Sequence, residues 1–204
     1  MVKVKLCGLR THNDVDIIHR YTPDYAGFIF ASSKRQVTPV LAKELITRIT
    51  NAQCIGVFVN QPVQEVADIA SFCNLDGIQL HGDESSEYVK ELKKLIPLPI
   101  WKACRMRKRE DIIELPGIDH LLLDSFSPTV YGGSGKRINI ELLEGFDVSN
   151  CFLAGGVDTE NVEELIRLHP YGIDVSSSLE RNGYKDEEKI KTFMTKVNEI
   201  RGKL

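Results

Sequence analysis

The sequence predicts a single-domain α/β protein over residues 1–204, with the fold of a (β/α)₈ barrel, also called a TIM barrel. Short apolar segments recur at even intervals along the chain, and segments of helical periodicity separate them. Strands joined by helices pair in parallel, because no tight turn can connect parallel neighbours. A length of 204 residues suits a small barrel without an inserted domain. An open doubly wound sheet is the alternative that the same alternation allows.

Eight segments rich in β-branched and apolar residues fit the strands of this barrel. In chain order they are 2–7 (VKVKLC), 25–31 (YAGFIFA), 54–59 (CIGVFV), 75–80 (LDGIQL), 98–104 (LPIWKAC), 120–124 (HLLLD), 151–155 (CFLAG) and 171–176 (YGIDVS). The expected helices follow them at 12–20, 39–50, 61–73, 84–95, 108–114, 140–145, 159–168 and 186–201. Pro39 suits the first turn of its helix, where its missing N–H would have no partner anyway.

Composition narrows the classes of partner and cofactor. With 42% apolar residues and a net charge of −3, the chain can bury one core and carries no basic excess. We therefore expect neither nucleic acid nor a membrane as partner, which leaves a small anion as a candidate. The five cysteines form no CxxC motif, so we expect no metal site and no disulfide framework. No leader-like segment and no membrane-length apolar run occurs, which predicts a cytoplasmic location.

The C-terminal ends of the strands are where a barrel places its chemistry, because all eight ends gather around one mouth. Cys7 ends the first expected strand and Asp124 the sixth, so the two side chains would face each other across the mouth. This arrangement suits a base and an acid on either side of a substrate. The structural alternatives are a buried cysteine that packs as a small apolar residue and a carboxylate that serves a turn.

The last two expected strands end in sequences that suit a phosphate group. Gly155 and Gly156 leave the seventh strand just before a helix, and a run of serines follows the eighth. Backbone N–H groups and hydroxyls at these two neighbouring loops can bind a phosphate together. Taken alone, the double glycine is equally compatible with a tight turn.

The glycine-rich segment YGGSGKR follows the sixth strand and contains Gly132, Gly133 and Gly135. It is not a Walker motif, because Val130 and Arg137 stand where that motif needs glycine and Ser or Thr. The functional interpretation is a lid over the mouth, and the alternative is an ordinary surface connection.

Seven motifs in order resemble the phosphoribosylanthranilate isomerase family of tryptophan biosynthesis: VKLCGLR, GFIFASSKRQVTP, IGVFVNQP, GIQLHGDE, LLLDSFSPTVYGGSGK, LAGGVDTENV and IDVSSSLE. The resemblance covers the whole chain. It implies a barrel that converts N-(5-phosphoribosyl)anthranilate into 1-(2-carboxyphenylamino)-1-deoxyribulose 5-phosphate by an Amadori rearrangement, with no cofactor and no metal. It also implies a monomer or a homodimer.

The resemblance also assigns roles to residues. It implies that Cys7 is the general base, that Asp124 is the general acid, and that Arg35 lies near the anthranilate carboxylate. The residues that it implies for the phosphate are Gly155, Gly156, Asp174, Ser176 and Ser177. His81 is a candidate substrate contact, with a hydrogen-bonded structural histidine as the alternative. Gln79 is expected in the inner layers of the barrel.

Two loops depart from the family pattern. Members commonly read GGTGxxFDW after the sixth strand, whereas this chain reads GGSGKRINI, with Asn139 at the acidic position. Members commonly read SSGxE after the eighth strand, and here Ser178 replaces the glycine. The rival hypotheses are another phosphosugar enzyme with the same fold and a catalytically inactive barrel that binds a phosphorylated ligand.

Overall fold

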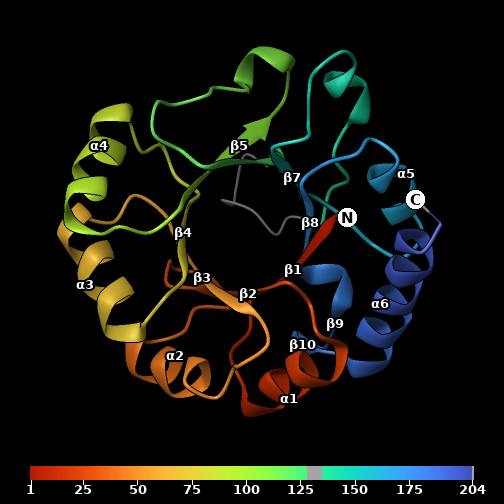
Figure 1. The fold of residues 1–204 in the computed structure, drawn as a ribbon, viewed down its shortest axis with the longest axis horizontal. Coiled ribbons are helices and arrows are strands. Elements are labelled where there is room, and N and C mark those ends of the chain that lie inside the picture. Colours follow the sequence, from red (N-terminus) through yellow and green to blue (C-terminus); the bar gives the residue numbers. More distant parts are fainter. Residues whose placement is uncertain (128–134, 204) are drawn as a thin grey trace.

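The computed structural model describes residues 1–127 and 135–203, which form a closed barrel of eight parallel strands (Figure 1). The strands are β1 (Lys3–Cys7), β2 (Tyr25–Ile29), β3 (Gln53–Phe58), β4 (Gly77–Leu80), β5 (Ile100–Met106), β6 (His120–Ser125), β7 (Cys151–Leu153) and β8 (Gly172–Val175). Each strand pairs with its neighbour in sequence, and β8 pairs with β1 to close the barrel. The predicted (β/α)₈ barrel is confirmed.

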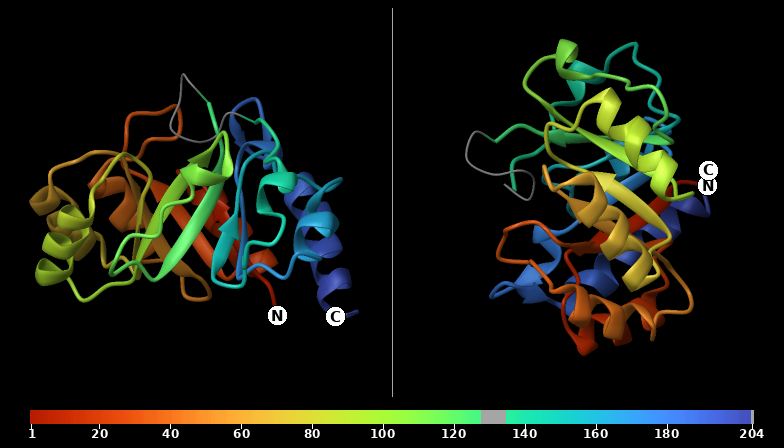
Figure 2. Two further views of the ribbon diagram at one scale, coloured as in Figure 1. Left: turned by 90° about the horizontal axis from the view of Figure 1, so that it is seen from above. Right: turned by 90° about the vertical axis from the view of Figure 1, so that its left-hand side faces the viewer.

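Helices surround the barrel and cover its outer face (Figures 1 and 2). They are α1 (His12–Tyr21), α2 (Pro39–Ile46), α3 (Val63–Cys73), α4 (Ser86–Leu95), α5 (Val162–Ile166) and α6 (Glu187–Arg201). Thr11, Thr38, Ser85 and Asp186 cap four of them by accepting a hydrogen bond from a backbone N–H of the first turn. Pro39 occupies the first turn of α2 as predicted.

Two of the expected helices do not form. The segments 108–114 and 140–145 contain only the 3₁₀ turns η1 (Arg109–Asp111) and η2 (Ile140–Leu143). Both segments are short, so few helical bonds would offset the cost of nucleating a helix. Pro116 follows the first segment closely, and Gly145 ends the second with a left-handed φ of 67°. The prediction of a full helix after each of β5 and β6 was wrong.

A β-hairpin that the sequence analysis did not predict follows β8. It consists of β9 (Glu180–Arg181) and β10 (Tyr184–Lys185), joined by a turn at Asn182 and Gly183 with φ values of 53° and 81°. Both turn residues are left-handed, as a two-residue type I′ turn requires. Arg10 donates to the Gly183 carbonyl and lies over the Tyr184 ring, which holds the hairpin against the start of α1.

Aromatic side chains fill the N-terminal end of the barrel. The rings of Trp101 and Phe152 stack with centroids 4.3 Å apart, and Tyr25 meets both edge-on. The Tyr25 and Tyr171 hydroxyls are 3.2 Å apart and share a hydrogen bond. These residues lie at or near the starts of their strands, so the opposite end of the barrel remains for a site. Within the described ranges, no helix is long and apolar enough to cross a membrane.

Candidate active site

A cavity of about 810 Å³ opens at the C-terminal ends of the strands. The predicted site residues that the structure describes all line it: Cys7, Arg35, His81, Asp124, Gly135, Gly155, Gly156, Asp174, Ser176 and Ser177. Gly132 and Gly133, which were predicted in the lid, lie outside the described residues. The C-terminal ends of the strands therefore bring together side chains from loops that lie far apart in the sequence.

Cys7 lies at the end of β1, with its side chain toward the cavity and its surface 5% exposed. Gly27 on the neighbouring strand makes room for it, because a Cβ at Gly27 would lie 2.8 Å from the Cys7 sulfur and 3.1 Å from Cε of Lys5. Lys5 is two residues earlier and therefore points to the same side of the strand. The thiol and the buried lysine chain thus pack against the same glycine.

Burial and the neighbouring lysines shift the pKa of Cys7 in opposite directions. Burial raises the pKa of the Cys7 thiol above its usual value, and the ammonium groups of Lys5 and Lys185 act in the opposite direction. Burial also lowers the pKa of Lys5, but the charges and hydrogen bonds of Asp174 and Cys7 together outweigh it and the net shift is upward. Lys5 Nζ donates to Asp174 Oδ1 at 3.1 Å. The lysine is therefore held as a buried ammonium beside the thiol.

Asp174 was predicted among the phosphate-binding residues. It does line the cavity, but its carboxylate is paired with the fully buried Lys5. A carboxylate repels a phosphate, whereas it is well suited to neutralise an ammonium that has left water. The structure therefore favours a different role for Asp174, which is to hold Lys5.

Asp124 lies in β6, and its carboxyl group has two fixed neighbours. Its Oδ1 accepts a hydrogen bond of 2.8 Å from the N–H of Ser125. Its Oδ2 lies 3.3 Å from Nε2 of His81, a contact that falls outside hydrogen-bond geometry. His81 follows β4, where Gln79 is buried in the barrel interior as expected. The carboxyl group is thus fixed at the edge of the cavity beside an imidazole.

Arg35 follows β2 and lines the cavity, and its guanidinium is held by Glu180 of β9. Its Nε and Nη2 donate to the two Glu180 oxygens at 2.5 and 3.0 Å. Lys185 of β10 donates to Glu180 at 3.2 Å and to the carbonyl of Ser176 at 3.0 Å. The two cations outweigh the effect of burial and lower the pKa of Glu180. The sequence analysis missed Lys5, Glu180 and Lys185.

The loops after β7 and β8 contact each other and the segment after the undescribed residues. Gly155 and Gly156 have left-handed φ values of 84° and 56°, and a Cβ on either would lie 2.7 Å from a backbone nitrogen. Glycine is therefore required there. Ser176 Oγ donates to the Cys7 carbonyl at 2.9 Å, and Ser178 Oγ donates to the Val157 carbonyl. The departure at Ser178 thus adds a bond between the two loops.

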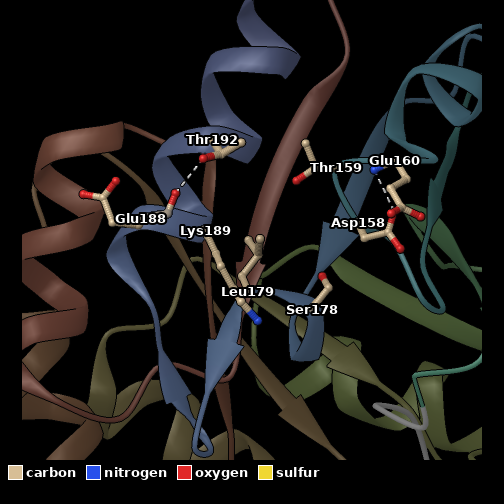
Figure 3. Close-up of a pocket in the computed structure, with 8 residues that line it drawn as sticks. All are labelled: Asp158, Thr159, Glu160, Ser178, Leu179, Glu188, Lys189 and Thr192. Atoms are coloured by element: carbon tan, nitrogen blue, oxygen red, sulfur yellow. Dashed lines mark hydrogen bonds between the residues drawn. The ribbon is translucent and has the colours of Figure 1, made fainter.

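A second cavity of about 390 Å³ lies between the start of α6 and the loop after β7 (Figure 3). Arg137 binds the carboxylates of Asp158 and Glu160 at 2.9 and 2.8 Å, and Lys189 donates to the Glu180 carbonyl. None of the predicted site residues that the structure describes lines this cavity. Throughout residues 1–127 and 135–203, no group of three or more His, Cys, Asp or Glu side chains could hold a metal ion.

The chain is similar over nearly its whole length to a known family. The sequence model of the family described as N-(5'-phosphoribosyl)anthranilate (PRA) isomerase matches residues 4–196. The chain belongs to the PRA isomerase family. A relative named N-(5'-phosphoribosyl)anthranilate isomerase, from Thermoanaerobacter sp. (strain X514), is 43% identical over 206 residues, which cover 98% of this chain and 100% of the relative.

Solved structures of PRA isomerases have the same fold. The enzyme from Thermus thermophilus is 27% identical and superposes with a TM-score of 0.87, over 98% of this chain and 100% of its own. A second PRA isomerase structure was solved in complex with reduced 1-(o-carboxyphenylamino)-1-deoxyribulose 5-phosphate. It is 28% identical, with a TM-score of 0.82 over 98% of this chain and 100% of that one.

Proposed function

We propose that the chain isomerises N-(5-phosphoribosyl)anthranilate to 1-(2-carboxyphenylamino)-1-deoxyribulose 5-phosphate, a step of tryptophan biosynthesis. One observation supports this most strongly, namely that a single cavity is lined by a thiol, a carboxyl group and two adjoining glycine- and serine-rich loops. Family membership agrees with it, as does the phosphorylated ligand named for a related structure. The rival phosphosugar barrels, such as indole-glycerol-phosphate synthase and ribulose-phosphate epimerase, resemble this family in fold but place Lys and Glu, or paired aspartates with a metal, at the strand ends.

Asp124 is proposed to open the ribose ring. As the C1′–O bond breaks, the ring oxygen takes the proton of the Asp124 carboxyl group, and the nitrogen lone pair forms the C1′=N bond of a Schiff base. The acid must be fixed within hydrogen-bond reach of that oxygen. β6 and the bond from the Ser125 N–H hold the carboxyl group in place.

Cys7 is proposed to act in the second half of the reaction. Its thiolate removes the C2′ proton, which the Schiff base has made acidic, and an enolamine forms. The enolamine takes a proton at C1′ and loses the proton of its 2′-oxygen, which gives the ketone. The Lys5 ammonium supplies the positive charge that favours the thiolate, against the effect of burial.

The two ends of the substrate need separate binding groups. For the phosphate we propose Gly155, Gly156, Ser176 and Ser177, which line one side of the cavity. For the anthranilate carboxylate we propose Arg35, whose guanidinium Glu180 holds by two hydrogen bonds. A guanidinium fixed in this way recognises a carboxylate with little loss of side-chain entropy.

The activity can be tested by mixing the purified protein with freshly generated N-(5-phosphoribosyl)anthranilate and following the anthranilate-ring fluorescence. We expect the wild type to consume the substrate. Cys54→Ala is the matched control for substitutions of Cys7, because Cys54 is a buried cysteine that does not line the cavity. This variant should consume the substrate as the wild type does. A wild-type protein that binds the product but never consumes the substrate would instead be an inactive phosphate-binding barrel.

A further inference from the structure

A chain of buried polar contacts runs from Lys5 through Gln79 to His81. Lys5 Nζ lies 2.8 Å from Gln79 Oε1, and Gln79 Nε2 lies 2.8 Å from His81 Nδ1. The other ring nitrogen, Nε2, lies 3.3 Å from Asp124 Oδ2. Within the described part of the chain, this Nε2 makes no hydrogen bond. His81 is only 5% exposed and lines the catalytic cavity.

Lys5 determines which way round the Gln79 amide lies. An ammonium can only donate, so the amide atom that faces Lys5 must be the carbonyl oxygen. The amide –NH₂ then faces His81, and because it can only donate, Nδ1 of the imidazole must accept. The proton of the neutral ring therefore lies on Nε2, the atom that faces Asp124 and the cavity.

The same contacts oppose a second proton on the ring. A proton on Nδ1 would meet the –NH₂ of Gln79, and two buried donors would face each other without an acceptor. Gln79 cannot turn round, because its amide nitrogen would then face the Lys5 ammonium. Lys5 in turn is held by Asp174 at 3.1 Å. Of the other charged groups near this loop, Lys102 and Glu84 bind each other at 3.0 Å and bind Gly82, and Arg105 binds Asp83 at 2.8 Å.

This restriction of His81 to its neutral form matters, because an imidazole without these contacts would take a proton from a neighbouring carboxyl group. Histidine has a pKa of about 6.5 and aspartic acid one of about 3.9, so a free pair becomes an imidazolium and a carboxylate. A general acid in that state has no proton to give. We propose that Lys5 and Gln79 are positioning residues that hold His81 as the neutral tautomer with its proton on Nε2, so that the ring does not take the Asp124 proton that ring opening needs. The proposal rests on the activity proposed above.

The protonation state of His81 can be measured directly by ¹⁵N NMR of the imidazole, with signals assigned from the spectrum of a His81→Gln variant. We expect the wild type to show a neutral ring with its proton on Nε2 throughout about pH 5 to 8, the range in which histidine ordinarily titrates. A proton on Nδ1, or an ordinary titration within that range, would overturn the proposal.

Gln79→Glu reverses the restriction, because a carboxylate accepts from both Lys5 and a protonated Nδ1. We expect His81 to become an imidazolium at neutral pH, and kcat to fall roughly 10²-fold, at the lower end of what a general acid contributes, with little change in KM. Gln53→Glu, on an exposed residue of β3, is the matched control and should change neither value. If the glutamate variant does not fold, Gln79→Met takes its place in the test. It removes both contacts of the amide, and His81 should then titrate in the ordinary range.

The two readouts separate this proposal from the proposed activity. An inactive wild type with a neutral, Nε2-protonated His81 would contradict the activity and leave the restriction on His81 intact. An active wild type whose His81 titrates normally would contradict the role of Lys5 and Gln79 and leave the activity intact.

Discussion

Individual residues around Cys7 determine whether its thiol can act as a base. The sequence singled out Cys7 and Asp124 because strand ends meet at one mouth. It did not single out Lys5, although the alternation of a strand places residues i and i+2 on one side, and Cys7 was already expected to face the mouth. Burial of a lysine depends on partners such as Gln79 and Asp174, which come from strands far away in the sequence.

The pKa of Cys7 leads to a prediction about its reactivity. Burial raises this pKa in the folded protein, so less thiolate should be present than in the unfolded chain at the same pH. Alkylation by iodoacetamide, followed at the Cys7 peptide by mass spectrometry, should show a midpoint at higher pH in the folded protein than in urea. A lower midpoint in the folded protein would mean that Lys5 and Lys185 outweigh burial.

At the scale of elements, the hairpin β9–β10 carries the polar contacts of Arg35. Its sequence signal was present, because Asn182–Gly183 is the preferred dipeptide of a type I′ turn. Each of its strands has only two residues, too few to show an alternating pattern. The missing helices after β5 and β6 show the opposite error, in which an amphipathic pattern was present but the segment was too short to form a helix.

Removing the charge of Glu180 should strongly destabilise the protein. Glu180→Gln leaves the buried cations of Arg35 and Lys185 without a carboxylate, which costs about 3–5 kcal/mol of unfolding free energy. Because the folded protein lowers the pKa of Glu180, its contribution is present at neutral pH and is lost as the pH falls through that lowered pKa.

Urea denaturation of the wild type and the variant at neutral and acidic pH measures both effects. Glu163→Gln is the matched control, because Glu163 forms an exposed pair with Arg167 that is worth at most about 1 kcal/mol. A similar loss of stability in the two variants would show that the buried ion pair contributes nothing beyond a surface pair.

At the scale of the whole molecule, the barrel must be closed at the place where its two termini meet (Figure 2). The order of the strands followed from the alternation of apolar and amphipathic segments, because connections between parallel strands are short and of one hand. The contacts that join the ends could not be read from that pattern. Asp24 accepts from the N–H of Val4 at 2.9 Å and from Arg201 of α6 at 2.7 Å.

Asp24→Asn should therefore weaken the closure of the barrel, at a cost of about 1.5–3 kcal/mol for hydrogen bonds to a charged group. Burial raises the pKa of Asp24, but the bonds from Lys3, Val4 and Arg201 outweigh it and lower the pKa overall. The difference between wild type and variant should thus be largest at neutral pH and shrink as the pH falls below about 4. Thermal unfolding at both pH values tests this, with the exposed Asp16→Asn as control. Equal effects of the two substitutions would contradict it.

The measurement that tests the account most directly compares turnover with ligand binding in the Cys7→Ser and Asp124→Asn variants. If Cys7 is the base and Asp124 the acid, each variant should lose about 10² to 10⁴ in kcat. Both should still bind the product as the wild type does, because the phosphate loops and Arg35 are unchanged. If either variant turns over at close to the wild-type rate, that residue is not the acid or the base, and the roles proposed for this cavity are wrong.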